Sequence, residues 1–249
     1  MLTGRRDGTT HRAVELLASL PHQLRLIGGL AVLCRVGVPH RSTVDLDAVT
    51  RDLAGIHDDI ASLAVTAPGG GQYTFAGNFD LDVIDVSPEP SAALIAELTA
   101  HDEPLGDLDL NVIAHTWAFE TATSLDLVAV EDGTGVVLAR ADGRLVASST
   151  GLVTMKATTV PLRSSSKPEK RASDFYDLGR LLVVGDVDRS GIAAIPEELR
   201  EPVMARIRHW FVDPAGRDRT YREVRRFDEP RLDLDEVADA VESLVPPAA

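Results

Sequence analysis

Two segments of the chain alternate between apolar residues and aspartates, a period of two that sorts side chains onto opposite faces of a β-strand. The first, STVDLDAVT (42–50), puts Asp45 and Asp47 on one face and aliphatic side chains on the other. The second, TFAGNFDLDVIDV (74–86), does the same with Asp82 on its polar face. Each segment therefore predicts a strand that covers a core with one face and presents carboxylates with the other.

The segments around these strands predict a mixture of helices and strands. LRLIGG (24–29) is expected to form a short buried strand that ends in glycines, and LAVLCRVG (30–37) a short helix. Apolar residues recur with helical spacing in residues 11–20, 51–66 and 87–98, which are therefore predicted to be helices. Strands thus alternate with helices through the first hundred residues, which favours a mixed α/β arrangement.

The character of the sequence changes near residue 150. Residues 107–148 are predicted to hold further short strands, LDLNVIA (108–114) among them, separated by glycine-containing turns. Beyond residue 150 the apolar spacing becomes helical. We therefore predict an α/β (α+β) fold, with a mixed sheet and flanking helices in residues 1–150 and a helical part in residues 151–249.

The composition narrows the classes of function. With 39 acidic against 25 basic residues the net charge is -14, which argues against charge-driven nucleic-acid binding by the whole surface. The single cysteine, Cys34, excludes an internal disulfide and a zinc site built from several cysteines. Because no apolar run approaches the roughly 20 residues that span a bilayer, we expect a cytoplasmic protein with no membrane partner.

The carboxylates on the two predicted strands indicate a divalent cation. Charges as close as those of Asp45 and Asp47 repel each other unless something neutralises them, and Mg²⁺ prefers such hard oxygen ligands. Asp82 is the first choice for a third ligand. Asp85, which the alternation turns toward the apolar face, is the second. Two metals held by three such carboxylates would activate an attacking oxygen and stabilise the leaving pyrophosphate of a nucleotide transfer.

A pair of glycines, Gly28 and Gly29, precedes the acidic strand. At the start of a helix such a turn lets backbone N–H groups approach a triphosphate. Each signal alone is weak, because Asp-x-Asp recurs at 232–235 in this acidic chain and a glycine pair can be only a tight turn. Their combination on strand, helix and strand is much more specific.

These two signals together carry a resemblance to a known family. The stretch GGLAVLCRVG…HRSTVDLDAV (28–49) resembles the first motif of the polymerase-beta-like nucleotidyltransferase superfamily, and more narrowly that of the AbiEii-type toxins of type IV toxin–antitoxin systems. That motif has a Gly-Gly or Gly-Ser turn followed by Arg-x-Ser/Thr-x-Asp-x-Asp. It is matched here by Gly28, Gly29, Arg41, Thr43, Asp45 and Asp47.

A later segment (155–182) resembles the downstream motif of the same family, a lysine on a helix, a basic loop and then Arg-Asp-hydrophobic-aromatic-Asp-Leu. The resemblance assigns Lys156 as the nucleotide-contacting lysine and Asp174 as the downstream catalytic acid. Arg171 is separated from Asp174 by two residues, where the family has the two adjacent, so Asp177 stays an alternative. By charge alone, two solvated helices with ion pairs would be the simpler interpretation.

An arginine-rich segment lies near the C-terminus, outside the span 24–185 that carries the resemblance. Residues 204–226 hold seven arginines against three acids, with aromatic residues interleaved. This combination can bind phosphates and stack the bases of an RNA end. It is about as typical of a helix that packs its aromatics inward and leaves its arginines in solvent. The RNA-binding candidates are Arg206, Arg208, Arg222, Arg225 and Arg226.

The resemblance implies a nucleotidyltransferase-fold catalytic domain followed by a helical domain that contributes the lysine and aspartate motif. The implied reaction is Mg²⁺-dependent transfer of a nucleoside monophosphate from an NTP, with release of pyrophosphate. A tRNA 3′ end is the implied acceptor, and an antitoxin the implied partner. Asp45, Asp47 and Asp82 would hold the metal. The triphosphate would be bound by Gly28, Gly29, Arg41, Thr43 and Lys156.

Two alternatives stay open. A small-molecule nucleotidyltransferase that modifies antibiotics would share the metal site and prefer a cationic substrate, which an acidic protein attracts. A non-catalytic regulatory protein would keep the fold without the chemistry. The intact pair Asp45 and Asp47 and the lysine Lys156 argue against the second alternative.

Overall fold

The computed structural model describes residues 1–37, 45–100, 104–163, 168–227 and 231–244. Its internal packing divides the chain into two compact units. Unit 1 consists of Met1–Pro88 and Phe119–Ser148, and unit 2 of Glu89–Ala118 and Ser149–Ala249. The stretch Glu89–Ala118 therefore groups with the C-terminal helices.

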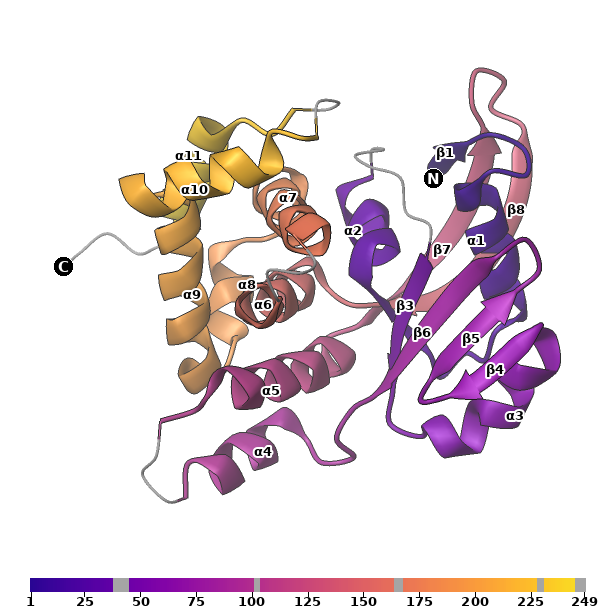
Figure 1. Cartoon of the computed structure of the whole chain (residues 1–249), viewed down its shortest axis with the longest axis horizontal. Helices are drawn as coiled ribbons and strands as arrows, with labels where there is room; N and C mark the ends of the chain where they lie inside the picture. Colours follow the sequence, from indigo (N-terminus) through magenta and orange to yellow (C-terminus); the bar gives the residue numbers. More distant parts are fainter. Residues whose placement is uncertain (38–44, 101–103, 164–167, 228–230, 245–249) are drawn as a thin grey trace. The chain divides into compact units, whose positions relative to one another are not determined.

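Unit 1 is built on one mixed sheet, in which the described residues form eight strands in the order β1-β7-β8-β2-β3-β6-β5-β4 (Figure 1). The strands are β1 Leu2–Gly4, β2 Arg25–Ile27, β3 Asp45–Thr50, β4 Thr66–Gly69, β5 Gln72–Phe75, β6 Phe79–Asp85, β7 Thr123–Glu131 and β8 Val137–Val146. The predicted fold class, a mixed sheet with flanking helices and a helical C-terminal part, is confirmed.

The two aspartate-bearing strands are neighbours at the centre of the sheet. β3 and β6 pair in parallel, with Asp47 opposite Asp82. β2 pairs antiparallel with β3, and Ile27 lies opposite Asp47. Since the next residue, Gly28, begins a helix, the glycine turn and the acidic strand meet at one point of the sheet.

Three helices belong to this unit: α1 Thr9–Ser19, α2 Gly28–Val36 and α3 Leu53–Leu63. α1 packs on β7 and β8, and α3 on β5 and β6. α2 is apolar on almost every side and buries most of its residues, as a helix inside a core does. The side chain of Asp52 caps α3 by accepting a hydrogen bond from Gly55 N at 2.9 Å.

Unit 2 is helical in its described residues. Its elements are α4 Ser91–Leu98, α5 Asp107–Glu120, α6 Ser149–Thr159, the short 3₁₀ helix η1 Val160–Leu162, α7 Pro168–Val184, α8 Arg189–Ala194, α9 Glu197–Phe211, α10 Pro214–Val224 and α11 Leu234–Leu244. The last two residues of α5 group with unit 1. The centre is α6, in which every residue from Ser149 to Thr158 is buried.

Two local predictions were wrong. LDLNVIA (108–114) is not a strand but the first half of α5, because its alternation continues into a helical spacing of buried residues. Asp85 does not face the core. It is exposed, and its Oδ1 accepts a hydrogen bond from Leu53 N at 3.3 Å.

Candidate active site

The aspartates of β3 and β6 gather on one face of the sheet. The parallel register pairs them two by two, Asp45 with Asp80 and Asp47 with Asp82. Because alternate residues of a strand share a face, all four carboxylates leave the sheet on the same side. Asp80 is exposed and accepts a hydrogen bond from Thr74 Oγ1 at 2.8 Å. The other three aspartates are half-buried.

Gly28 connects this acidic face to the N-terminus of α2. Its φ of +68° lies in the left-handed region, which costs a residue with a side chain about 1–2 kcal/mol. A Cβ atom at Gly28 would lie 1.9 Å from Asp47 Oδ2, so the carboxylate packs directly against the glycine backbone. The carboxylate thus lies at the positive end of the helix, where a negative charge is favourable.

Replacing Gly28 with alanine is expected to lower the rate of any reaction at this site by about a hundredfold, since a displacement near 1 Å can cost that much. The new methyl group would push the Asp47 carboxylate out of place and strain the backbone at the same time. The measurement is turnover of the variant beside its thermal unfolding curve.

Gly37 supplies the matched control for this substitution. It ends α2 with a φ of +76°, and a Cβ atom there would meet none of the described residues within 4 Å. Gly37→Ala therefore adds comparable backbone strain without touching a carboxylate. Equal losses of activity in the two variants would show that strain alone matters and that the contact with Asp47 does not.

The donor chemistry of the acidic face suits Mg²⁺, because carboxylate oxygens are hard ligands and a cation relieves their repulsion. Within the described residues, no three His, Cys, Asp or Glu side chains are grouped so that they could hold a metal ion by themselves. Mg²⁺ is commonly bound by one or two carboxylates together with substrate phosphates. Asp47 and Asp82, which lie opposite each other in the register, are two carboxylates of the kind that such a site needs.

Two predicted nucleotide-binding residues, Arg41 and Thr43, lie outside the described residues. The two glycines predicted to bind the nucleotide, Gly28 and Gly29, are the first residues of α2. The first N–H groups of a helix have no partner within the helix and form a ready anion-binding site.

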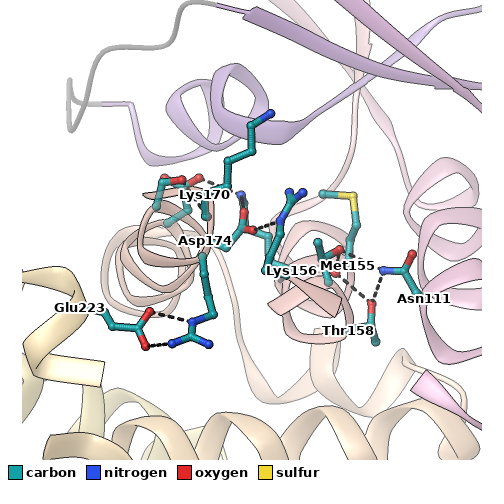
Figure 2. Close-up of polar contacts among 12 residues, drawn as sticks. Asn111, Met155, Lys156, Thr158, Lys170, Asp174 and Glu223 are labelled. Atoms are coloured by element: carbon teal, nitrogen blue, oxygen red, sulfur yellow. Dashed lines mark hydrogen bonds and ion pairs between the residues drawn. The ribbon is translucent and has the colours of Figure 1, made fainter. Parts of the chain in front are cut away.

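A second cluster of charged side chains lies inside unit 2, between α6 and α7 (Figure 2). Lys156 is the one charged residue of α6 and is 3% exposed. Its Nζ lies 2.8 Å from Asp174 Oδ1 and 2.8 Å from Asp177 Oδ2. Asp177 is fully buried and Asp174 is 5% exposed, so the lysine offsets the charge of two largely buried carboxylates.

Two further residues border this cluster. The Nε of Arg163 donates to Asp174 Oδ2 at 2.9 Å, so each oxygen of Asp174 faces a cation. On α5, His115 Nδ1 lies 2.8 Å from the carbonyl oxygen of Asn111. Burial lowers the pKa of the His115 imidazole, an effect that the carbonyl hydrogen bond opposes and the charge of Arg163 reinforces. The ring is therefore neutral at pH 7, with its proton on Nδ1.

The structure brings together the lysine and the acid that the downstream motif predicts. Lys156 contacts Asp174 and also its alternative, Asp177, so both aspartates belong to one network. Sequence reasoning missed His115, because it lies on the helix whose start had been predicted as a strand. The helical spacing of Asn111 and His115, four residues apart, was the signal that could have indicated it.

The arginine-rich segment covers parts of α9 and α10, and its arginines have different surroundings. Arg206 turns inward, where it pairs with Asp107 and donates to the carbonyl oxygen of Ala157 at 3.3 Å. The other four RNA-binding candidates are exposed, and one of them pairs with a carboxylate on its own helix, Asp218. These four are Arg208, Arg222, Arg225 and Arg226.

Three aromatic residues in or beside this segment pack against α7. Trp210 and Phe211 meet Phe175 edge to face, with ring centroids 5.1 and 6.4 Å apart. Phe227 lies 4.8 Å from the ring of Tyr176. These contacts match the inward-packing interpretation of the aromatics, while most of the arginines stay at the surface.

The acidic sheet face beside a glycine turn and the buried lysine–aspartate network on later helices are the features that the resemblance to nucleotidyltransferases predicts. The family model of the AbiEii nucleotidyl transferase toxins of type IV toxin–antitoxin systems matches residues 14–244, and the chain belongs to that family. The match extends past residue 185, so it includes the arginine-rich segment.

Membership implies a nucleotidyltransferase toxin and an antitoxin partner. None of the curated proteins compared with the chain matches it. Among the described residues, no helix has the length and apolar character needed to cross a membrane.

Proposed function

We propose that the chain is a Mg²⁺-dependent nucleotidyltransferase that moves a nucleoside monophosphate from an NTP to the 3′ end of a tRNA. The proposal rests mainly on the parallel register of β3 and β6, which sets Asp47 opposite Asp82 next to the Gly28 turn. Family membership supports the general class of reaction.

In this proposal unit 1 binds the nucleotide and the metal. Asp45, Asp47 and Asp82 would hold Mg²⁺, which when bound would neutralise phosphate charge as pyrophosphate leaves. The N–H groups at the start of α2, next to Gly28 and Gly29, would donate to triphosphate oxygens. Arg41 and Thr43 are proposed to contact the same phosphates.

Unit 2 would supply the groups that act on the acceptor. Lys156 holds Asp174 and Asp177 and contributes a positive charge against the phosphates. Asp174 would orient the attacking 3′ hydroxyl and accept its proton. Arg163, bound to the second oxygen of Asp174, would keep that carboxylate in one orientation.

An RNA acceptor is favoured over a small cationic one by the four exposed arginines of α9 and of the end of α10 in a chain of net charge -14. Arginine is the side chain best suited to bind phosphates at a surface. A cationic antibiotic would instead be attracted by the acidic background. The two acceptors are therefore compared in one assay.

The experiment incubates the protein and Mg²⁺ with each α-³²P-labelled NTP and with either total tRNA or aminoglycosides, beside an Asp45→Ala variant. The expected result is label in tRNA-sized RNA with a preference among the NTPs, absent from the variant. Label in the aminoglycosides alone would replace the RNA acceptor with a small molecule. Equal labelling by the Asp45→Ala variant would remove the metal site from the proposal.

A further inference from the structure

Unit 2 contains a cavity of about 190 Å³ that the proposed chemistry does not use. Its walls come from η1, α7, α9 and α10, and they include Arg171, Arg219, His209, Trp210 and Thr220. Cations, an aromatic ring and a hydroxyl thus meet at one place on the helical unit.

The charge of the cavity is positive in a chain that is otherwise strongly acidic. The Nε of Arg171 donates at 2.8 Å to Glu223, the carboxylate labelled in Figure 2, and the Nη2 of Arg171 donates to its other oxygen. The pair is neutral overall. Because a guanidinium has five N–H donors, Arg171 keeps further donors that Glu223 does not use. Within the described part of the chain, the exposed Arg219 has no hydrogen-bond or ion-pair partner. Arg219 therefore gives the cavity its net positive charge.

A threonine hydroxyl also lies in the wall of the cavity. Thr220 is 1% exposed and lines the cavity. Most buried polar groups in folded proteins are hydrogen-bonded. An oxygen-rich anion in the cavity would accept from this hydroxyl and from the two arginines.

Close packing of α10 against α9 positions the residues that line this cavity. Gly216 lets α10 approach α9 closely, since a Cβ atom there would lie 1.8 Å from the carbonyl oxygen of His209. That approach carries Arg219 and Thr220, on the next turn of α10, to the side of Trp210. The edge-to-face contact of Trp210 with Phe175 fixes the indole ring in turn.

The volume of the cavity limits the size of the ligand that it can hold. Pockets that bury a whole small molecule begin at about 300 Å³, so 190 Å³ suits a phosphate group rather than a nucleotide. An indole beside a phosphate can stack the neighbouring base of a single strand. We propose that this cavity binds a backbone phosphate of the RNA acceptor, an inference that rests on the proposed RNA-directed function.

The test is equilibrium binding of labelled tRNA to the full chain without NTP, at several salt concentrations, for Arg219→Ala and Thr220→Val. Loss of a charge-assisted hydrogen bond should weaken tRNA binding by about tenfold in Arg219→Ala, and the salt dependence should fall by about one phosphate contact. Thr220→Val, which keeps the shape of the side chain, should weaken it about threefold. NTP binding and the rate at saturating tRNA should not change.

Arg217→Ala is the control, because it removes the same charge from the same helix while its partner is Asp235, outside the cavity. Equal weakening in Arg217→Ala and Arg219→Ala would overturn the proposal in favour of a general charge effect. Weaker NTP binding in Arg219→Ala would assign the phosphate to the nucleotide and overturn it too. Transfer by the wild type to RNA is scored separately, so failure of the cavity and failure of the RNA-directed function are distinguishable.

Discussion

Asp47→Asn is expected to fold like the wild type and to lose nucleotide transfer by a factor on the order of a thousand. Loss of a residue that merely orients a metal ligand costs about 10–100-fold, so loss of a ligand itself should cost more. The asparagine keeps the shape of the side chain against Gly28 but removes the charge that a metal requires. The measurement is transfer from the preferred NTP, beside Mn²⁺ binding by calorimetry in the presence of that nucleotide.

Asp80→Asn is the matched control, because Asp80 lies on the same face of the same strand pair and is exposed and bound to Thr74. It is expected to keep most of the transfer activity and of the Mn²⁺ binding. Full activity of Asp47→Asn would contradict the assignment of Asp47 as a metal ligand. Equal losses in both variants would mean that the total negative charge of the face matters rather than one carboxylate.

The acidic strands were predictable because their pattern is local. Alternation over a few residues settles which side chains share a face, and Asp45, Asp47 and Asp82 follow from it directly. The parallel register that sets Asp47 opposite Asp82 depends on the long connection formed by residues 51–78, and no local pattern specifies it. Sequence could therefore name the carboxylates but could not show that they are neighbours.

The misassigned start of α5 has a physical cause. Leu108, Leu110 and Val112 alternate with polar residues, as in a strand, yet Leu108 and Val112 are exposed and only Leu110 is buried. The side chains that hold the helix in place come later, among them Ile113 and Trp117. A window of seven residues was too short to reveal the helical period.

The inward turn of Arg206 was not predictable, because its partner Asp107 lies 99 residues away on another helix. The buried pairing of Lys156 with two aspartates is a different case. The motif predicted the residues, but the completeness of their burial comes from the packing of α6 against α7 and α9. The composition gives the number of charged residues, but it does not show which of their side chains are buried.

Lys156→Met is expected to destabilise the chain by about 3–5 kcal/mol, the cost of removing one partner from a buried ion pair. Methionine fills a similar volume, so the loss comes from the carboxylates and not from a cavity. Asp174 keeps Arg163 as a partner, whereas Asp177, fully buried, loses the cation that neutralises it. Thermal and chemical unfolding measure the change, and nucleotide transfer is measured on the protein that remains folded.

The double variant Lys156→Met/Asp177→Asn separates the structural role of the lysine from its role in the reaction. Removing the charge of Asp177 as well should restore most of the stability, since replacing both members of a buried ion pair is often close to neutral. Transfer should not return, because the double variant still lacks the positive charge that the proposed function assigns to Lys156. Recovery of transfer together with stability would show that Lys156 only holds the fold. Unchanged stability of the single variant would contradict the buried pairing itself.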